Sequence, residues 1–209
     1  MRINSKAKID ELIKRYPELN NCYSDIILAT EALIKCYKNG GKLLVCGNGG
    51  SASDSLHIVG ELMKSFRLKR PISKELRELI GDDILSDSLE VGLPAISLVS
   101  EVALTTAFSN DRVAEAVFAQ GVLGYGKKGD VLLAISTSGN SMNCVDAVKV
   151  ANAMGLVSIS LTGKKDSKLS LLSKITIKAQ ATETFKIQEL HLPIYHAICL
   201  ALEEEFFGE

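Results

Sequence analysis

Five short apolar runs constrain the fold of this 209-residue chain more than any other feature. They are rich in Val, Ile and Leu and are bounded by turn residues: KLLVC at 42–46, PAISLV at 94–99, DVLLAIS at 130–136, LVSISLTG at 156–163 and KITIKA at 174–179. Runs of this kind suit strands that are covered on both faces, as in a parallel sheet. Helical patterns separate most of them, which indicates repeated βαβ units. The sequence therefore predicts an α/β sandwich with a parallel sheet of about five strands.

Helical periodicity frames this strand-rich region at both ends. Residues 1–39 form a predicted N-terminal arm of two amphipathic helices, which Gly40 and Gly41 end. A long C-terminal helix is expected from Thr184 to Phe206. Because a chain of this length supplies one substantial core, we expect a single domain over residues 1–209.

Residues 67–93 interrupt the alternation of strands and helices. This segment passes from basic to acidic and has little sustained apolar periodicity. It is interpreted either as a charged insertion on the surface with a short helix, or as a lid that borders the functional site.

The net charge and the cysteines argue against several classes of protein. The formal net charge is -1, whereas a face that binds nucleic acid needs clustered Lys and Arg. The five cysteines lie in apolar stretches without a C-x-x-C pair, which favours reduced, buried thiols in the cytosol. The chain has no signal core, and no apolar stretch reaches about 18 residues. We therefore expect a cytoplasmic protein that binds neither nucleic acid nor membranes.

Two loops repeat one arrangement. LLVCGNGGSAS and LLAISTSGNSMN each run from an apolar strand through a small polar loop into a helix. The start of a helix offers unpaired backbone N–H groups and a partial positive charge, which together favour a bound anion. The second loop adds the hydroxyl groups of Ser136, Thr137, Ser138 and Ser141. The alternative is a pair of ordinary helix caps, but two such loops at matching places favour phosphate binding.

A nucleotide cofactor is not predicted. Residues 47–52 fit G-x-G-x-x-A, a variant of the dinucleotide fingerprint, which needs an acidic residue at the end of the next strand. The acidic residues at that distance, such as Glu75, lie in the charged insertion instead. The chain also has no G-x-x-x-x-G-K-[ST] phosphate loop.

Titratable and amide side chains recur at helical spacing in two segments. His57 and Glu61 are four residues apart behind the first loop, and Gln188 and His196 are eight apart in the last helix. Such a set could perform acid–base chemistry or hold a divalent metal through N and O ligands. His57 alone could instead be a core histidine, and His191 is interpreted as an interface residue.

Four segments, in order along the chain, carry a resemblance to a known family. They are CGNGGSASDSLHIVGEL at 46–62, SND at 109–111, GDVLLAISTSGNSMN at 129–143 and IQELHLPIYH at 187–196. On these segments the chain resembles the sugar isomerase (SIS) domain family, and within it the phosphoheptose isomerases. The resemblance covers nearly the whole chain. It implies a three-layer, doubly wound fold, a homotetramer with active sites between subunits, and isomerisation of sedoheptulose 7-phosphate to a heptose 7-phosphate through an enediol(ate).

The resemblance also implies roles for individual residues. Glu61 would be the general base and His196 the general acid. The substrate and its phosphate would be bound by Asn48, Gly49, Gly50, Ser51, Asp111, Ser136, Thr137, Ser138, Ser141 and Gln188. In members that bind zinc, the ligands match His57, Glu61, Gln188 and His196.

Three departures leave alternatives open. Phosphoheptose isomerases usually carry an arginine where this chain has Ser65, and Asp-Arg where it has Phe185-Lys186; the 67–93 insertion is also longer than usual. The chain could therefore isomerise another sugar phosphate. It could also be a non-catalytic SIS protein that binds a sugar phosphate or a replication or regulatory partner, although Glu61 and His196 together favour an enzyme.

The apolar stretch at residues 190–202 bears on assembly. It is apolar almost all round the predicted helix, and such a helix must be buried on every side. Either partner chains cover it in an oligomer, or the N-terminal helices of the same chain do.

Overall fold

A parallel sheet of five strands lies at the centre of the computed structural model, which describes residues 1–209. The strands are β1 Leu43–Gly47, β2 Ala95–Ser97, β3 Val131–Ile135, β4 Val157–Thr162 and β5 Ile175–Lys178. Their order is β2-β1-β3-β4-β5, and every neighbouring pair is parallel. The prediction of five parallel strands is confirmed. Because the chain moves from β1 to one side for β2 and to the other for β3, the topological switch point lies between β1 and β3.

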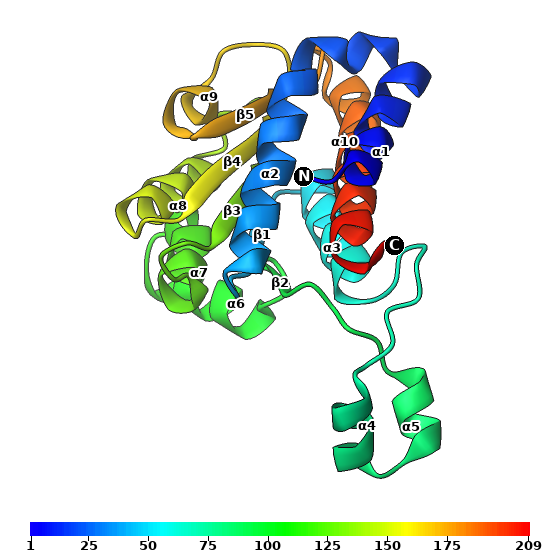
Figure 1. Cartoon of the computed structure of the whole chain (residues 1–209). Coiled ribbons are helices and arrows are strands. Elements are labelled where there is room, and N and C mark those ends of the chain that lie inside the picture. Colours follow the sequence, from blue (N-terminus) through cyan, green and yellow to red (C-terminus); the bar gives the residue numbers. More distant parts are fainter.

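Helices cover both faces of the sheet (Figure 1). On one face lie α2 Tyr23–Lys38, α3 Gly50–Met63 and α10 Thr184–Phe207; α1 Ile3–Arg15, linked to α2 by the 3-10 helix Pro17–Cys22, packs outside α10. The other face carries α7 Val117–Tyr125, α8 Met142–Ala153 and α9 Lys168–Leu172, with α6 Val102–Asp111 and the 3-10 helix Ala114–Ala116 beside them. The expected three-layer, doubly wound architecture is confirmed.

Alternation along the strands divides the core into two clusters. Leu43 and Val45 of β1 belong to the cluster under α2, α3 and α10, whereas Leu44 and Cys46 belong to the cluster under α7 and α8. Successive strand side chains point to opposite faces, and both faces are covered here. This explains why the strands read as continuous apolar runs. All five cysteines are free and buried, as expected.

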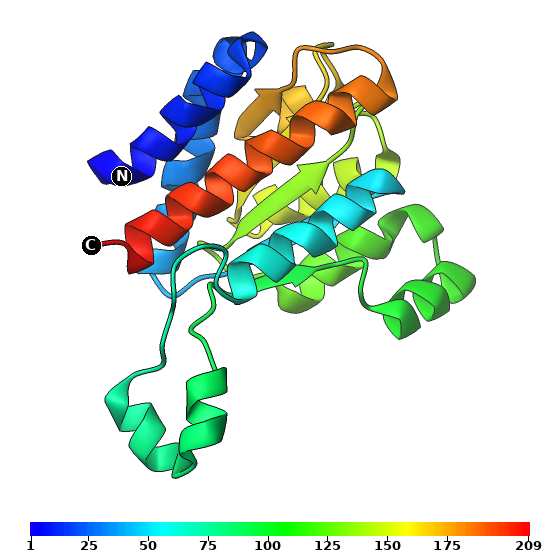
Figure 2. The ribbon, with the colours of Figure 1, turned by 90° about the vertical axis from the view of Figure 1, so that its right-hand side faces the viewer.

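The last helix is covered within the chain itself. In Figure 2, α1 runs along the outer side of α10, and α1 buries Ile9 and Leu12 there. Of the two explanations for the apolar stretch at 190–202, the structure favours coverage by the N-terminal helices. The stretch alone therefore gives no argument for an oligomer.

The interpretation of His191 as an interface residue is wrong. Its side chain is completely buried, and its Nε2 lies 3.2 Å from the carbonyl oxygen of Thr162 at the end of β4. A carbonyl only accepts hydrogen bonds, so Nε2 is the donor. Burial lowers the pKa of His191 to about 4. His191 is a neutral core residue that ties α10 to the sheet.

The charged insertion forms a helical hairpin, which we call the arm (residues 71–90). It contains two short helices, α4 Lys74–Ile80 and α5 Asp83–Ser88, above a single bridge between Pro71 and Glu90. Figures 1 and 2 show the arm extending away from the sheet and its covering helices. Within one chain it is thus a surface feature with two helices, and not a lid over the chain's own site. None of the helices combines the length and apolar composition needed to cross a membrane.

Candidate functional site

The two polar loops lie side by side at the switch point of the sheet. Gly47 at the end of β1 pairs with Ile135 at the end of β3, so both strands end at the same level. The loops are joined by two amide hydrogen bonds: Asn48 Nδ2 donates to Asn143 Oδ1 at 2.9 Å, and Asn143 Nδ2 donates back to Asn48 Oδ1 at 2.8 Å. Asn143 was not predicted, because only the fold brings it opposite Asn48.

A cleft of about 330 Å³ opens between these loops and the start of α10. It is lined by Asn48, Gly49, Gly50, Ser51, Ile135, Ser136, Thr137, Ser141, Thr184 and Gln188. We call it the loop cleft. Eight of the ten predicted substrate-binding residues line it. Of the other two, Ser138 lines the neighbouring cleft, which it shares with Thr137, and Asp111 is exposed at the end of α6 and lines neither. Thr184 was missed because nothing in the sequence marks the first residue of α10 as part of the site.

The loop cleft has hydrogen-bond donors but no charged side chain in its lining. Gly49 and Ser141 are the cap residues of α3 and α8, and neither helix start has a side-chain cap. The Ser141 hydroxyl instead lies 3.0 Å from that of Ser136. The interpretation of these serines as ordinary helix caps is therefore not supported. Hydroxyl groups that do not cap the helix, together with two helix starts, suit a bound anion.

Glycines permit one close approach in this cleft and another within the second loop. A side chain at Gly50 would place its Cβ 2.6 Å from Gln188 Nε2, so it would push the Gln188 amide away from the start of α3. Gly139 has a φ of +64°, and a Cβ there would lie 2.1 Å from Ser167 Oγ. The second loop thus needs glycine both for its backbone conformation and for space.

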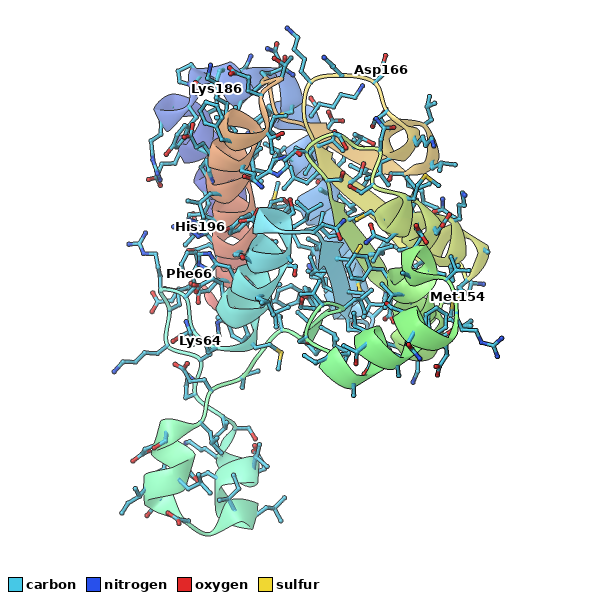
Figure 3. The ribbon with its side chains drawn as sticks, turned by 180° about the vertical axis from the view of Figure 1, so that it is seen from behind. Lys64, Phe66, Met154, Asp166, Lys186 and His196 are labelled. Carbon is cyan, nitrogen blue, oxygen red and sulfur yellow. The ribbon has the colours of Figure 1, made fainter.

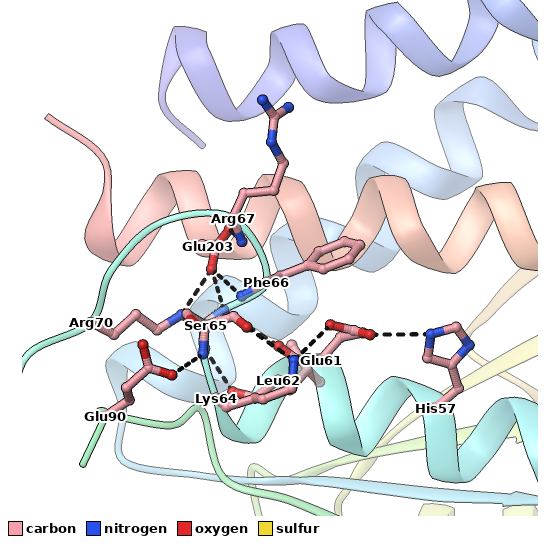
Figure 4. Close-up of polar contacts among 10 residues, drawn as sticks. All are labelled: His57, Glu61, Leu62, Lys64, Ser65, Phe66, Arg67, Arg70, Glu90 and Glu203. Atoms are coloured by element: carbon pink, nitrogen blue, oxygen red, sulfur yellow. Dashed lines mark hydrogen bonds and ion pairs between the residues drawn. The ribbon is translucent and has the colours of Figure 1, made fainter. Parts of the chain in front are cut away.

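Two to three turns further along α3 and α10, His57, Glu61 and His196 lie close together. His57 Nε2 lies 3.1 Å from Glu61 Oε1, and Glu61 Oε2 lies 3.4 Å from Lys64 Nζ (Figure 4). The ring of His196, from α10, lies 5.0 Å from that of His57 and 5.5 Å from that of Phe66. Figure 3 shows His196 and Phe66 on the same side of the molecule. The structure therefore brings together three of the four predicted metal or acid–base residues.

The surroundings of His196 favour its neutral imidazole form. Burial is the main cause that lowers its pKa; nearby His57 and Arg15 lower it further, and Glu61 opposes them. Its Nε2 atom is buried and has no hydrogen-bond partner. A groove of about 360 Å³ borders His196, and its lining includes the cations Arg15 and Arg67. His196 thus has a free nitrogen beside an open groove.

Two residues that the sequence did not single out extend the contacts of His57. Its Nδ1 lies 3.0 Å from the Tyr195 hydroxyl, which in turn donates to Asp54 Oδ1 at 3.2 Å. Burial raises the pKa of Asp54, although the hydrogen bond from Tyr195 and nearby His57 oppose this. Burial and the Asp54 carboxylate raise the pKa of Tyr195 above its usual range.

A buried ion pair holds the end of α3 against α10. Glu203 Oε1 accepts from Arg70 Nη2 at 2.8 Å and from the Phe66 backbone N–H at 2.7 Å, and Oε2 accepts from the Arg67 N–H at 2.8 Å. Arg70 also donates to the carbonyl of Leu62 at 2.8 Å, which satisfies the last turn of α3. Figure 4 shows these contacts directly beside Glu61. We call this group the Arg70–Glu203 clamp.

The predicted metal ligands suit zinc by their chemistry. Imidazole and carboxylate are donors that zinc prefers, and the unpaired, buried His196 Nε2 fits a ligand atom. However, His57 and Glu61 face each other, and no group of three His, Cys, Asp or Glu side chains has the geometry of a metal site. Gln188 lies two turns nearer the start of α10, where its amide group is next to Gly50. Binding would require the four side chains to draw together.

Comparisons with known proteins agree with this architecture. The model of the SIS domain family matches residues 7–91 and 85–163. A phosphoheptose isomerase from Aneurinibacillus thermoaerophilus is 35% identical over 205 residues, which are 98% of this chain and 92% of that protein. Phosphoheptose isomerase 2 of Campylobacter jejuni is 39% identical over 181 residues, 87% of this chain and 80% of that protein. The solved structure of a phosphoheptose isomerase from Neisseria gonorrhoeae has a TM-score of 0.75 at 31% identity, with 95% and 96% of the two chains covered.

The chain belongs to the SIS domain family and, within it, to the phosphoheptose isomerase group. The resemblance carried by the four sequence segments is therefore confirmed.

Proposed function

We propose that this protein is an aldose–ketose isomerase that converts sedoheptulose 7-phosphate to a heptose 7-phosphate through an enediol(ate). Glu61 lies on α3 and His196 lies on α10, and the first turns of these two helices line the loop cleft. This arrangement is the observation that carries the proposal. From Gly50 to Glu61 α3 rises by about 16 Å, and from Gln188 to His196 α10 rises by about 12 Å. Side chains on a helix tilt toward its N-terminus, so the carboxylate of Glu61 and the imidazole of His196 reach back toward a sugar whose phosphate is held in the loop cleft.

The phosphate end would be held by the loop cleft. Ser136, Thr137 and Ser141 offer hydroxyl donors, and the uncapped starts of α3 and α8 add a favourable partial charge. This binding is common to substrate and product, because the reaction does not change the phosphate. It orients the sugar so that its reacting carbons lie toward Glu61.

The reaction needs one proton moved between adjacent carbons. The Glu61 carboxylate would take the proton from the carbon next to the carbonyl, and would return it to the neighbouring carbon of the enediolate. His196, kept neutral by burial, would donate a hydrogen bond to the oxygen on which charge develops. A neutral imidazole performs this task in other isomerases.

Zinc is a further part of the proposal. His57, Glu61, Gln188 and His196 would hold the ion, which when bound would polarise the sugar carbonyl. Measuring the metal content of the purified protein, before and after dialysis against a chelator, tests this part separately from activity. One zinc ion per chain is expected.

We also propose a homotetramer in the cytoplasm. The resemblance to phosphoheptose isomerases supports the tetramer, and five buried thiols without a disulfide suit a reducing compartment. Light scattering and localisation of a tagged protein are the corresponding measurements.

The decisive experiment is an isomerisation assay on a panel of ketose and aldose phosphates of five to seven carbons. Sedoheptulose 7-phosphate should give the highest kcat/KM. Glu61→Gln keeps the shape of the side chain but removes the base, so kcat should fall about 10²–10⁴-fold with the fold intact. Glu31→Gln, an exposed change on α2, is the matched control. Activity of Glu61→Gln within a few-fold of the wild type would contradict the role of Glu61.

A second candidate is the same reaction on another sugar phosphate. It is favoured by Ser65 and Phe185-Lys186, which differ from the usual residues of the group. In the structure Lys186 pairs with Glu183, and Phe185 is exposed. A higher kcat/KM for a pentose or hexose phosphate in the same panel would select this candidate.

A further inference from the structure

Asn48 lies between two glycines in the first loop, and its own loop does not hold its side chain. A side chain at Gly47 would place its Cβ 2.6 Å from the Ser51 carbonyl oxygen, and Gly49 has a φ of +56°. Both positions therefore favour glycine, and neither offers a side chain that could pack against Asn48. Asn48 is also exposed. What keeps its amide in one rotamer must come from outside this loop.

The side-chain hydrogen bonds of Asn48 all go to the start of α8. Its Nδ2 donates to Asn143 Oδ1 at 2.9 Å, and its Oδ1 accepts from Asn143 Nδ2 at 2.8 Å. The remaining contact is with Cys144 Sγ, which lies 3.9 Å from Nδ2, and sulfur is a weak acceptor. Asn143, which is 95 residues away in the sequence, therefore holds an amide of the other loop.

The amide of Asn143 has a defined orientation. Its Oδ1 also accepts from the backbone N–H of Cys144 at 3.0 Å, in the first turn of α8. A backbone N–H only donates, so the atom that faces it is the oxygen. The Nδ2 group of Asn143 then faces Asn48, whose oxygen must accept from it. None of these three hydrogen bonds involves a group that ionises.

We propose that Asn143 is a positioning residue that holds the Asn48 amide in one orientation at the wall of the loop cleft. Asn48 lines this cleft and Asn143 does not, so Asn143 acts through Asn48. Because Asn143 uses one lone pair of Asn48 Oδ1, the second lone pair remains to accept from a hydroxyl group of the sugar. This assignment rests on the proposed function, in which Asn48 contacts the substrate.

The reciprocal pair has a consequence for affinity. Without Asn143, the Asn48 side chain would rotate and its oxygen and nitrogen would exchange places. It would then have to be ordered whenever a sugar binds, and ordering one side chain at a binding site weakens affinity by about 3- to 10-fold. With Asn143 present, this ordering takes place when the protein folds. The pair therefore acts on the sugar, whereas the hydroxyl groups and helix starts act on the phosphate.

The orientation is tested first without a ligand, by crystal structures of the wild type and of Asn143→Ala. In the wild type the Asn48 amide should face Asn143, and in the variant it should occupy another rotamer or several. Asn39→Ala is the matched control, because it is an exposed change at the end of α2, before β1 and far from the loop cleft. Thermal unfolding verifies that each variant is folded. An Asn48 side chain that keeps its position in Asn143→Ala would overturn the proposal.

A double-mutant cycle then tests whether Asn143 acts through Asn48. The ligand is a heptitol 7-phosphate, which has no carbonyl group and does not react, and binding is measured by calorimetry. Asn143→Ala should bind it about 3- to 10-fold more weakly than the wild type, and Asn48→Ala should lose at least as much. The double variant should bind like Asn48→Ala alone, because no amide is left to position. Inorganic phosphate should bind all four proteins within about twofold, since Ser136, Thr137 and Ser141 are unchanged.

The outcomes separate this proposal from the proposed function. A double variant whose loss is the product of the two single losses would show that Asn143 only ties the loops together, and would overturn the proposal. Wild-type protein that binds the heptitol phosphate and shows the expected cycle, but isomerises no sugar phosphate, would refute the proposed function alone. Wild-type protein that binds no heptitol phosphate would also refute that function, and the crystal structures would still decide whether Asn143 positions Asn48.

Discussion

At the scale of residues, a substitution of Ser141 tests phosphate binding separately from catalysis. Its hydroxyl lines the loop cleft and is not used to cap α8. A hydrogen bond to a charged group contributes about 1.5–3 kcal/mol, so Ser141→Ala should raise KM for the phosphorylated sugar about 10- to 100-fold. The unphosphorylated sugar, used as the control ligand, should bind the variant and the wild type alike. Equal weakening of both ligands in calorimetric titrations would show that this loop does not bind phosphate.

His191 makes the stability of the protein depend on pH. Its folded pKa is about 4, compared with about 6.5 for an ordinary histidine. Below pH 6.5 the unfolded chain binds a proton that the folded chain refuses, so stability falls as the pH falls toward 4. From pH 7.5 to pH 5 this single residue should remove about 2 kcal/mol of unfolding free energy.

Urea unfolding of the wild type and of His191→Gln at the two pH values measures this effect. Glutamine can still donate to the Thr162 carbonyl but does not titrate. The variant should therefore lose about 2 kcal/mol less than the wild type between pH 7.5 and pH 5. Identical losses in the two proteins would contradict the assignment of His191 as a buried neutral imidazole.

At the scale of elements, the Arg70–Glu203 clamp connects stability to the site. Both side chains are about 1% exposed, and removing one partner of a buried ion pair costs about 3–5 kcal/mol. Glu203→Ala also leaves the N–H groups of Phe66 and Arg67 without their acceptor. We expect a loss of this size in urea unfolding. Asp146→Ala, which removes the exposed pair with Lys149, should cost less than about 1 kcal/mol.

The position of this clamp adds a kinetic expectation. The clamp fixes the last turn of α3, which includes Glu61, so Glu203→Ala should also lower kcat more than it raises KM. A variant that is less stable but has the wild-type kcat would show that the clamp serves the fold alone.

The sequence predicted the elements better than it predicted their contacts. Strands with apolar runs and the loops that follow them were found because strand periodicity and loop chemistry are local properties. The burial of His191 was not predicted, and the coverage of α10 by the N-terminal helices was only one of two alternatives, because an apolar surface does not reveal which surface covers it. Asn143, Tyr195 and Asp54 were missed for a related reason. Each acquires its role from a partner about 90 or more residues away.

The role of Asp111, which was carried over from the resemblance, stays a prediction. Its SND motif matched the family, yet α6 buries none of its residues and Asp111 lies outside both clefts. Ser138, in contrast, lies next to the predicted position, in the neighbouring cleft. Local sequence therefore located the loops, while the orientation of each side chain depended on the packing of the whole chain.

At the scale of the whole molecule, the arm is the part whose apolar side chains do not pack against the rest of the chain. Its helices have seven and six residues, well below the length at which an isolated helix is stable in water. Leu79 and Ile84 are 85% and 84% exposed, and Ser86 is the only residue of either helix that is buried. The arm therefore has no core of its own, and its apolar side chains would be better placed against another chain of the proposed tetramer.

The double substitution Leu79→Ser and Ile84→Ser tests this idea. The wild type should scatter light as four chains of 22.5 kDa, about 90 kDa. If the arm packs between chains, the variant should dissociate to smaller species at protein concentrations where the wild type stays assembled. Its unfolding free energy as a separate chain should change little, because both side chains are exposed there. Leu171→Ser, on α9 and 83% exposed, is the matched control and should leave the assembly unchanged. An unaltered mass of the double variant over a hundredfold dilution would exclude the arm from the interface, and a wild type of 22.5 kDa would exclude the tetramer itself.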